Sequence, residues 1–303
     1  MPALLLHMTL AREMTTRADA AGPLAEAAKA APDALLLGSI LPDLPYHARF
    51  IGQLVRHLAG REYLLSEWGD VLHTRGTGRL ALSFLAHARR SHLSAEARDR
   101  VLALAAGYLS HHTVDRVVHP VVNRVVEREL GSGASGGAPP LRVHERIERH
   151  QSLFHHEDLL GHELPGSPYP RRMVGQMAGS GLHRPMLDEP LRRAFRAACL
   201  ETHGRAPTRA ELSDWLWGTT AYGMLLSSPL GRLERPSGDG AELRARYYRG
   251  PGIDLVSPLE RAQDVTTRAW RAGDQLLLSD RLDDEARAVF LRHVPDVDLG
   301  TGA

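Results

Sequence analysis

The sequence predicts an all-α protein, and three observations lead to this expectation. Apolar residues recur at helical spacing along most of the chain, and no stretch shows the clear alternation of a half-buried strand. Hydrophobic residues make up 43% of the 303 residues, which is ordinary for a globular protein and enough for a core. The single cysteine, Cys199, excludes an internal disulfide and a thiolate zinc site, so the fold must be stabilised by packing.

The first half of the chain shows the clearest helical periodicity, with boundaries uncertain by about 2–4 residues. It predicts helices over residues 2–17, 23–31, 34–40, 76–90, 95–130 and 141–160. The stretch from Leu44 to Glu67 has no clear pattern. Glycine, serine, alanine and proline fill residues 131–140, and this composition favours a solvated loop, with a lid over a site as the alternative.

The second half of the chain contains recognisable helix N-termini but no cluster of candidate catalytic or metal-binding residues. Thr208 and Glu211 have the spacing of a capping box, and Ser257 and Glu260, around a proline, repeat it. Aromatic residues and methionine recur at helical spacing near residues 215–224, which favours a packing role over a ligand site. We expect a metal-binding catalytic region in residues 1–165 and a C-terminal helical region in residues 166–303, packed together as one domain.

Charge and termini limit the choice of partners. The formal net charge is +1, which gives no general electrostatic reason to expect nucleic acid or an anionic membrane. The first residues show no basic leader, and no apolar run approaches the ~18 residues of a membrane-spanning helix, so a cytoplasmic protein is expected. Of the 17 histidines, 14 precede Glu163, which places the chemistry in the first half.

The most informative segment contains His111, Asp115 and His119, spaced four residues apart. On a helix these side chains share one face, and that face continues the apolar stripe of the predicted core. A chain of this composition has a random expectation of only about 0.05 for such a triple. A buried carboxylate between two imidazoles needs compensation, which a divalent cation would provide. The alternative is a hydrogen-bonded core cluster without a metal.

Other candidate ligands lie before and after this helix. His144 and Glu148 form a second pair at helical spacing. His7 lies in the apolar N-terminal helix, and Asp43 ends the turn Gly38-Ser-Ile-Leu-Pro-Asp43. Each of these features alone is more often structural than functional.

In this order, the pieces resemble the zinc-dependent phospholipase C family, which is related to the fungal single-strand nucleases. The resemblance covers roughly residues 2–157 and depends on His7, the Gly-Ser-x-x-Pro-Asp turn, the run Gly-Tyr-Leu-Ser-His-x-x-x-Asp-x-x-x-His-Pro, and His144-x-x-x-Glu148. The third piece is the most specific. The resemblance implies an all-helical fold that holds up to three zinc ions in a cleft.

The resemblance also implies how ligands are shared. Asp115 would bridge two ions, and each ion would draw on a different set of residues. The sets are Asp43, His73, His111 and Asp115; Asp115, His7 and the amino terminus; and His119, His144 and Glu148. Removal of Met1 would expose Pro2 as the terminal ligand. Iron or manganese could occupy the same nitrogen and oxygen ligands. His57 is the alternative to His73, which is preferred because an amphipathic helix begins soon after it.

The implied activity is hydrolysis of a phosphoric ester, with a phospholipid-type diester as substrate. Two ions would activate a bridging water for in-line attack on phosphorus, a third would stabilise the leaving oxygen, and Asp43 would orient the water or act as base. Arginines near the cleft could bind phosphate, but none is singled out. The alternatives are a nucleotidase- or nuclease-like phosphoesterase and a non-catalytic helical protein stabilised by metal. The oligomeric state stays open.

Overall fold

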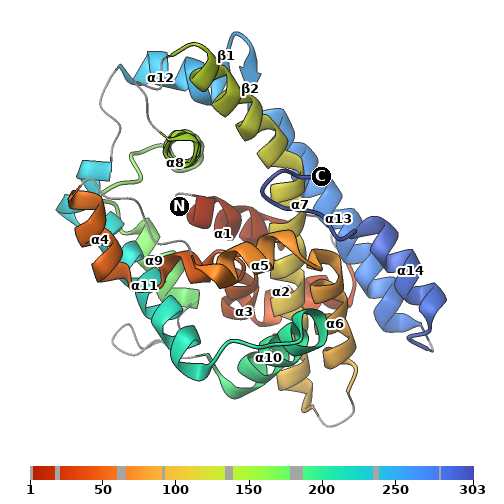
Figure 1. The fold of residues 1–303 in the computed structure, drawn as a ribbon. Coiled ribbons are helices and arrows are strands. Elements are labelled where there is room, and N and C mark those ends of the chain that lie inside the picture. The colour runs from red at the N-terminus through yellow and green to blue at the C-terminus, as the bar shows by residue number, and fades with distance from the viewer. Residues whose placement is uncertain are drawn as a thin grey trace.

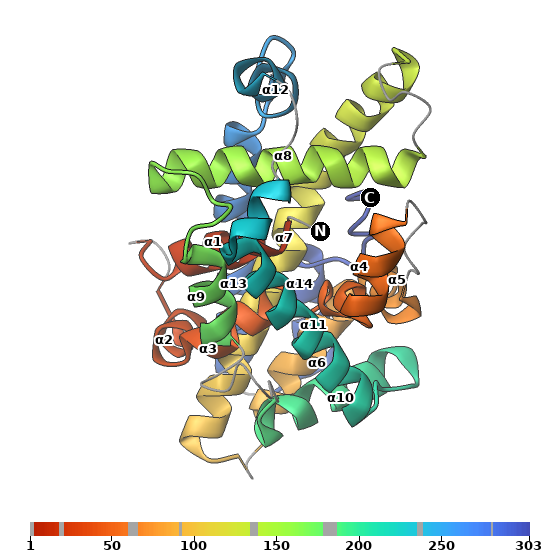
Figure 2. The same cartoon turned by 90° about the vertical axis from the view of Figure 1, so that its left-hand side faces the viewer.

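The computed structural model describes residues 3–17, 21–59, 66–90, 93–133, 139–177, 187–234, 239–279 and 281–303. Helices make up nearly all the regular structure of these residues, and an antiparallel pair of two-residue strands is the only sheet among them. The all-α prediction is therefore confirmed. The helices are arranged around the long α7, and α8 crosses the C-terminal half of α7 and lies above α1 in both views (Figures 1 and 2).

The six predicted helices of the first half are present within a few residues. The elements of this half are α1 (Ala3–Met14), α2 (Pro23–Ala30), α3 (Pro32–Gly38), η1 (Leu44–His47), α4 (Phe50–Leu58), α5 (Glu67–Thr74), α6 (Thr77–Ala88), α7 (Ala95–Gly131) and α8 (Pro140–Leu160). Of these, η1, α4 and α5 lie in or next to the stretch from Leu44 to Glu67, for which the sequence predicts no helix. The elements of the second half are α9 (Tyr169–Met177), α10 (Glu189–His203), α11 (Arg209–Ser227), η2 (Pro229–Glu234), α12 (Gly240–Tyr247), β1 (Arg249–Gly250), β2 (Ile253–Asp254), α13 (Val256–Leu278) and α14 (Asp284–His293).

Helix α7 is the central element and packs against α2, α3, α6 and α13. It begins where the Ser94 hydroxyl accepts a hydrogen bond from the Ala97 amide, and it continues for 37 residues. Residues 101–110 of this helix are rich in alanine and leucine and are all buried. A helix enclosed in this way provides a rigid support for the polar residues that follow in it.

Two glycines allow α3 to lie unusually close to α7. A Cβ added to Gly38 would lie 2.1 Å from the Leu104 carbonyl oxygen, and one added to Gly107 would lie 2.1 Å from that of Leu35. Any side chain at either position would force the helices apart. This contact brings the turn after α3, with Ser39 and Asp43, against the polar stretch of α7.

The hydrophobic core draws on both halves of the chain. The larger buried cluster contains Phe84 of α6, Phe195 of α10 and Trp270 of α13, and the Trp270 indole donates to the Ala106 carbonyl at 2.9 Å. Helices beyond residue 166 thus share the packing of the first half. The division at residue 165 stays a prediction.

Some details of the second half differ from expectation. Thr208 and Glu211 form the predicted capping box, but α13 begins at Val256, where the Asp254 carboxylate rather than Ser257 accepts from the first amide. Trp217 and Met224 are 41% and 47% exposed, so the packing predicted for the whole stretch near 215–224 holds only in part. Helical spacing alone does not show which turn of a helix reaches the core.

None of the described helices combines the length and apolar composition needed to cross a lipid bilayer. The location of the protein in the cell stays a prediction.

Candidate metal centre

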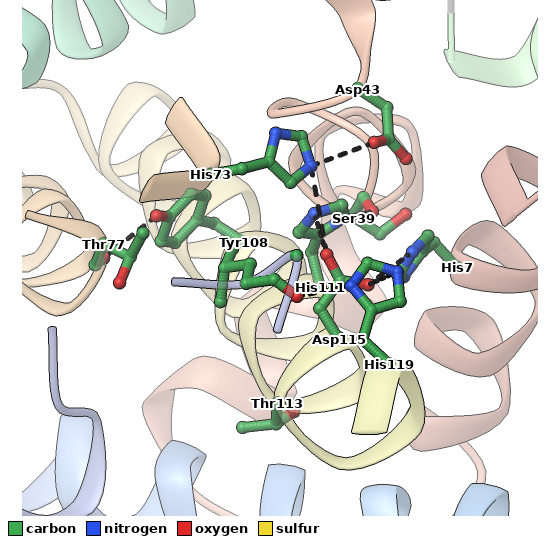
Figure 3. Close-up of polar contacts among 12 residues, drawn as sticks. His7, Ser39, Asp43, His73, Thr77, Tyr108, His111, Thr113, Asp115 and His119 are labelled. Atoms are coloured by element: carbon green, nitrogen blue, oxygen red, sulfur yellow. Dashed lines mark hydrogen bonds and ion pairs between the residues drawn. The ribbon is translucent and has the colours of Figure 1, made fainter. Parts of the chain in front are cut away.

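Eight of the residues singled out from the sequence converge from four helices and one turn. Figure 3 shows six of them, from His7 to His119. The eight residues are His7 of α1, Asp43 of the turn after α3, His73 of α5, His111, Asp115 and His119 of α7, and His144 and Glu148 of α8. All of them except His111 line one cavity of about 530 Å³. We call His7, Asp43, His73, His111 and Asp115 the inner group, and His119, His144 and Glu148 the outer group.

Asp115 lies at the centre of the inner group. One carboxylate oxygen, Oδ1, lies 3.1 Å from His7 Nε2, and the other, Oδ2, lies 3.0 Å from His111 Nε2. Two further imidazoles approach more loosely, His73 to 3.9 Å from Oδ2 and His119 to 3.8 Å from Oδ1. Because each oxygen faces a different pair of imidazoles, the carboxylate is placed to serve two neighbouring sites.

The remaining contacts complete the two groups. In the inner group, His73 Nε2 lies 3.2 Å from Asp43 Oδ1. In the outer group, Glu148 Oε1 lies 3.1 Å from His119 Nε2 and 3.2 Å from His144 Nε2. The described residues form three sets in which the potential ligand atoms of each set lie within 4.8 Å of one another. The sets are His7, His111 and Asp115; Asp43, His73 and His111; and His119, His144 and Glu148.

Backbone carbonyls fix the orientation of three imidazoles. The Nδ1 atoms of His111, His73 and His119 lie within hydrogen-bonding distance of the carbonyl oxygens of Ser39 at 2.9 Å, Gly69 at 2.7 Å, and Leu299. A carbonyl only accepts, so each Nδ1 must donate, and in a neutral ring Nε2 then carries a lone pair. All three Nε2 atoms face carboxylates, an arrangement that requires either a proton or a cation between them.

Unsatisfied atoms show that the described residues fit a metal. His7 Nδ1, Asp43 Oδ2, His111 Nε2 and Asp115 Oδ2 are buried and have no hydrogen-bond partner among the described residues. His111 Nε2 and Asp115 Oδ2 are 3.0 Å apart, yet they are not oriented as a hydrogen bond. Buried polar atoms left in this state are costly, and divalent cations with nitrogen and oxygen ligands would satisfy them.

The electrostatics of the centre favour positive charge. Burial raises the pKa of Asp115 and Asp43, but the histidines, above all His111, outweigh it, so that the pKa of Asp115 lies well below its usual range and that of Asp43 falls to about 2. Burial lowers the pKa of His119, but Asp115 and Glu148 outweigh it and raise this pKa to about 10. The site therefore keeps its carboxylates ionised and attracts a cation or a proton.

Tyr46 of η1 is a site residue that the sequence did not reveal. Its ring lies over α5, where a Cβ on Gly69 would approach it to 2.4 Å, and its hydroxyl is 3.4 Å from His73 Nδ1. Burial and the nearby carboxylates, first Asp43, raise its pKa. Tyr46 therefore stays a neutral hydrogen-bond donor beside the inner group.

The described centre includes neither the remaining candidate ligands nor three nearby histidines. Pro2 and the side chain of His57 lie outside the described residues. His112, next to His111 on the same helix, faces away from the centre, and its Nε2 lies 2.9 Å from the Pro295 carbonyl oxygen. His150 and His156 of α8 are buried and do not line the cavity. Their helix is covered on more than one face, which a single periodicity does not reveal.

Several further residues line the cavity without having been predicted. Besides the carboxylates of the two groups, it is lined by Asp70, Glu145 and Asp298, and by the apolar side chains of Leu4 and Leu141. Glu145 could have been noticed beside His144, whereas Asp298 gave no sequence signal because it is distant along the chain. No arginine or lysine is among the described residues that line this cavity.

Comparison with known proteins agrees with the geometry. The family model described as zinc dependent phospholipase C matches residues 6–166, which is more than half of the chain and includes both groups. No curated protein and no solved structure gives a significant match. The chain therefore belongs to the zinc-dependent phospholipase C family.

Proposed function

We propose that this protein hydrolyses phosphoric diesters, with the inner and outer groups as ligands of a multinuclear zinc centre. The observation that carries the proposal is the position of Asp115, whose two oxygens face four imidazoles from three helices. When bound, zinc supplies Lewis acidity toward water and phosphoryl oxygen. Up to three ions are proposed, one for each set of converging ligand atoms.

The chain's own residues would orient the reactants. Asp43 lines the cavity, and its buried Oδ2 has no hydrogen-bond partner among the described residues, so it is available to accept a proton from the attacking water. The Tyr46 hydroxyl can donate to a phosphoryl oxygen. Leu4 and Leu141 offer contacts to an apolar substituent of the substrate.

The charge of the cavity favours diesters over monoesters. Asp70, Glu145 and Asp298 add carboxylates beyond those of the two groups, and the described lining has no arginine or lysine to balance them. A phosphodiester carries one negative charge, whereas a monoester carries up to two near neutral pH. With zinc bound, the three additional carboxylates offset part of the charge of the ions, and this weakens the attraction of a dianionic monoester more than that of a monoanionic diester. This argument places a nucleotidase-like activity second and disfavours a polyanionic substrate.

The size of the cavity favours a catalytic metal centre over a purely structural metal site. A structural ion is enclosed by its ligands, whereas a catalytic ion keeps a position for substrate. Here the potential ligands line a cavity of about 530 Å³, the size of a small-molecule site. Turnover is therefore proposed, and a non-catalytic role is the alternative that the experiment must address.

The test compares two substrates on the zinc-loaded protein. We expect hydrolysis of bis(p-nitrophenyl) phosphate to exceed that of p-nitrophenyl phosphate. Asp43→Asn removes a negative charge but keeps an oxygen ligand, so it should lower diester turnover by a larger factor than zinc content. Asp264→Asn, at an exposed carboxylate paired with Arg17, should leave both unchanged. Preference for the monoester would favour the nucleotidase-like alternative. No turnover of either ester by folded, metal-loaded protein would contradict the proposed reaction.

A further inference from the structure

The segment 294–303 packs against the helices that carry the metal centre, although the family match ends at residue 166. The Thr77 hydroxyl of α6 donates to the Val297 carbonyl at 2.9 Å and accepts from the Val297 amide at 3.0 Å. The Asn123 amide group of α7 donates to the Gly300 carbonyl at 3.0 Å. Figure 1 shows this segment beside α7, close to the label C.

Leu299 makes the contacts that matter most for the centre. Its backbone amide donates to the carbonyl oxygen of His73 at 2.8 Å, and its own carbonyl accepts from His119 Nδ1. One peptide segment thus connects a histidine of the inner group with a histidine of the outer group. Its side chain is fully buried, which fixes its backbone relative to α5 and α7.

The bond to Leu299 determines how His119 can act as a ligand. Because Nδ1 donates to the Leu299 carbonyl, Nε2 is the ring nitrogen that faces the carboxylates, at 3.1 Å from Glu148 Oε1 and 3.8 Å from Asp115 Oδ1. Partners that hold the second ring nitrogen of a metal-binding histidine fix its tautomer and orientation. The Ser39 and Gly69 carbonyls do this for His111 and His73 from within the first half of the chain, but for His119 the acceptor lies 180 residues away, in the second half.

The segment reaches this position through a tight contact with α7. Pro120 has no amide hydrogen, so it cannot make the helical hydrogen bond to the Arg116 carbonyl. Gly302 lies against this carbonyl and against the Pro120 side chain. A Cβ on Gly302 would approach the Arg116 carbonyl oxygen to 2.7 Å and the Pro120 side chain to 2.8 Å. Gly302 also has a φ of 75°, which favours glycine. Replacement of Gly302 should therefore displace the segment without changing any proposed ligand.

We propose that the segment 294–303 is a positioning element of the metal centre and that Leu299 is the positioning residue for His119. The inference rests on the proposed function, because it takes His119 as a metal ligand. It assigns part of the second half a direct role in the affinity and geometry of the outer group. The inner group, held largely by α1, α3, α5 and α7, depends on the segment only through the backbone of His73.

The experiment compares Gly302→Ala with a matched glycine. Gly204 also has a positive φ, 71°, but a Cβ there would meet nothing within 4 Å, so Gly204→Ala carries similar backbone strain away from the centre. A second variant, Asn123→Ala, removes the bond to Gly300 without backbone strain, with Arg124→Ala on the exposed side of the same helix as its control. Zinc affinity is measured by competition with a chromophoric chelator, and cobalt-substituted protein gives the visible absorption of the ligand field.

We expect Gly302→Ala and Asn123→Ala to weaken the weakest-bound zinc by about 10–100-fold, as loss of a supporting partner does. Their cobalt spectra should change, while both controls match the wild type. Wild-type affinity and spectra in Gly302→Ala and Asn123→Ala would overturn the inference, although the metal centre itself would stand. Equal losses in Gly302→Ala and Gly204→Ala would also overturn it, since a general loss of stability would then explain them. Wild-type protein that binds no zinc or cobalt would overturn the proposed function together with the inference.

Discussion

The inner and outer groups of the metal centre differ in burial and in the origin of their support. Four of the five inner side chains, those of His7, His73, His111 and Asp115, are no more than 9% exposed, and Asp43, at 17%, falls within the 12–22% range of the three outer side chains. The Ser39 and Gly69 carbonyls, both in the first half of the chain, orient His111 and His73 of the inner group, but His119 of the outer group depends on Leu299. The comparison indicates that the metal centre combines a more buried inner group with a more accessible outer group. We therefore expect the metal ion of the outer group to dissociate first.

The largest expected effect comes from Asp115→Asn. This change keeps the side-chain volume but removes the charge that all four surrounding imidazoles face, so both inner sites should fail. Diester turnover should fall by more than the roughly 10²–10³-fold that loss of one transition-state contact costs. The rise in Tm on adding zinc should shrink as well. Steady-state assays and thermal unfolding with and without zinc measure these effects.

Asp254→Asn is the control for this change, because Asp254 is an exposed residue at the start of α13 and asparagine can keep its cap. The account is wrong about Asp115 if Asp115→Asn retains both its turnover and its zinc-dependent stabilisation.

A smaller effect is expected from Glu148→Gln, which removes the negative charge of the outer group alone. The affinity of one ion should fall by more than the roughly 10–100-fold typical of losing a supporting partner, while the inner ions remain. Zinc titration with a competing chelator counts the ions that are affected. Glu145→Gln is a matched control on the same helix, since Glu145 lines the cavity but belongs to neither group. A uniform loss of all ions in Glu148→Gln would show that the two groups do not act separately.

Glu145→Gln itself should alter substrate selection rather than metal binding. Removal of one unit charge from the cavity should raise monoester turnover relative to diester turnover by roughly fivefold, the effect of about 1 kcal/mol of charge repulsion. The ratio of kcat/KM for the two nitrophenyl esters measures this, and the effect should diminish at high salt. An unchanged ratio would mean that the charge of the cavity does not select the substrate.

The smallest effect is expected far from the centre, at Asp274 of α13. Burial raises its pKa to about 6, although the Leu24 amide donates to the carboxylate at 2.8 Å and opposes the rise. A raised folded-state pKa means that the stability contribution is complete below about pH 4 and is lost as pH rises through about 6. Asp274→Asn should therefore raise Tm by a few degrees at pH 8 and by less at pH 4. The opposite pH dependence would contradict this assignment.

The sequence was most informative where ligands and helical periodicity coincide. The spacing of His111, Asp115 and His119 predicts a shared helix face, and the structure has that face, because spacing within one helix determines direction. The turn that ends at Asp43 could be recognised as a motif. Its physical cause, the close contact of Gly38 with Leu104, became apparent only from the packing.

The rest depends on contacts between distant parts of the chain. Leu299 lies 180 residues after His119, and a backbone carbonyl leaves no trace in the type of residue that carries it. Tyr46 and Asp298 likewise reach the cavity through tertiary packing, without periodicity that would mark them. The absence of arginine from the described lining could not be foreseen either, because arginine is spread over the whole sequence.

The most direct test of the central claim is the metal content of wild-type protein purified without chelator or affinity metal, measured by mass spectrometry. The account predicts two to three equivalents of metal per chain, zinc above all, with iron or manganese as substitutes that the same ligands accept. Asp115→Ala measured in parallel should show a clear loss. One equivalent would indicate a single structural ion, and no metal in either protein would contradict the account.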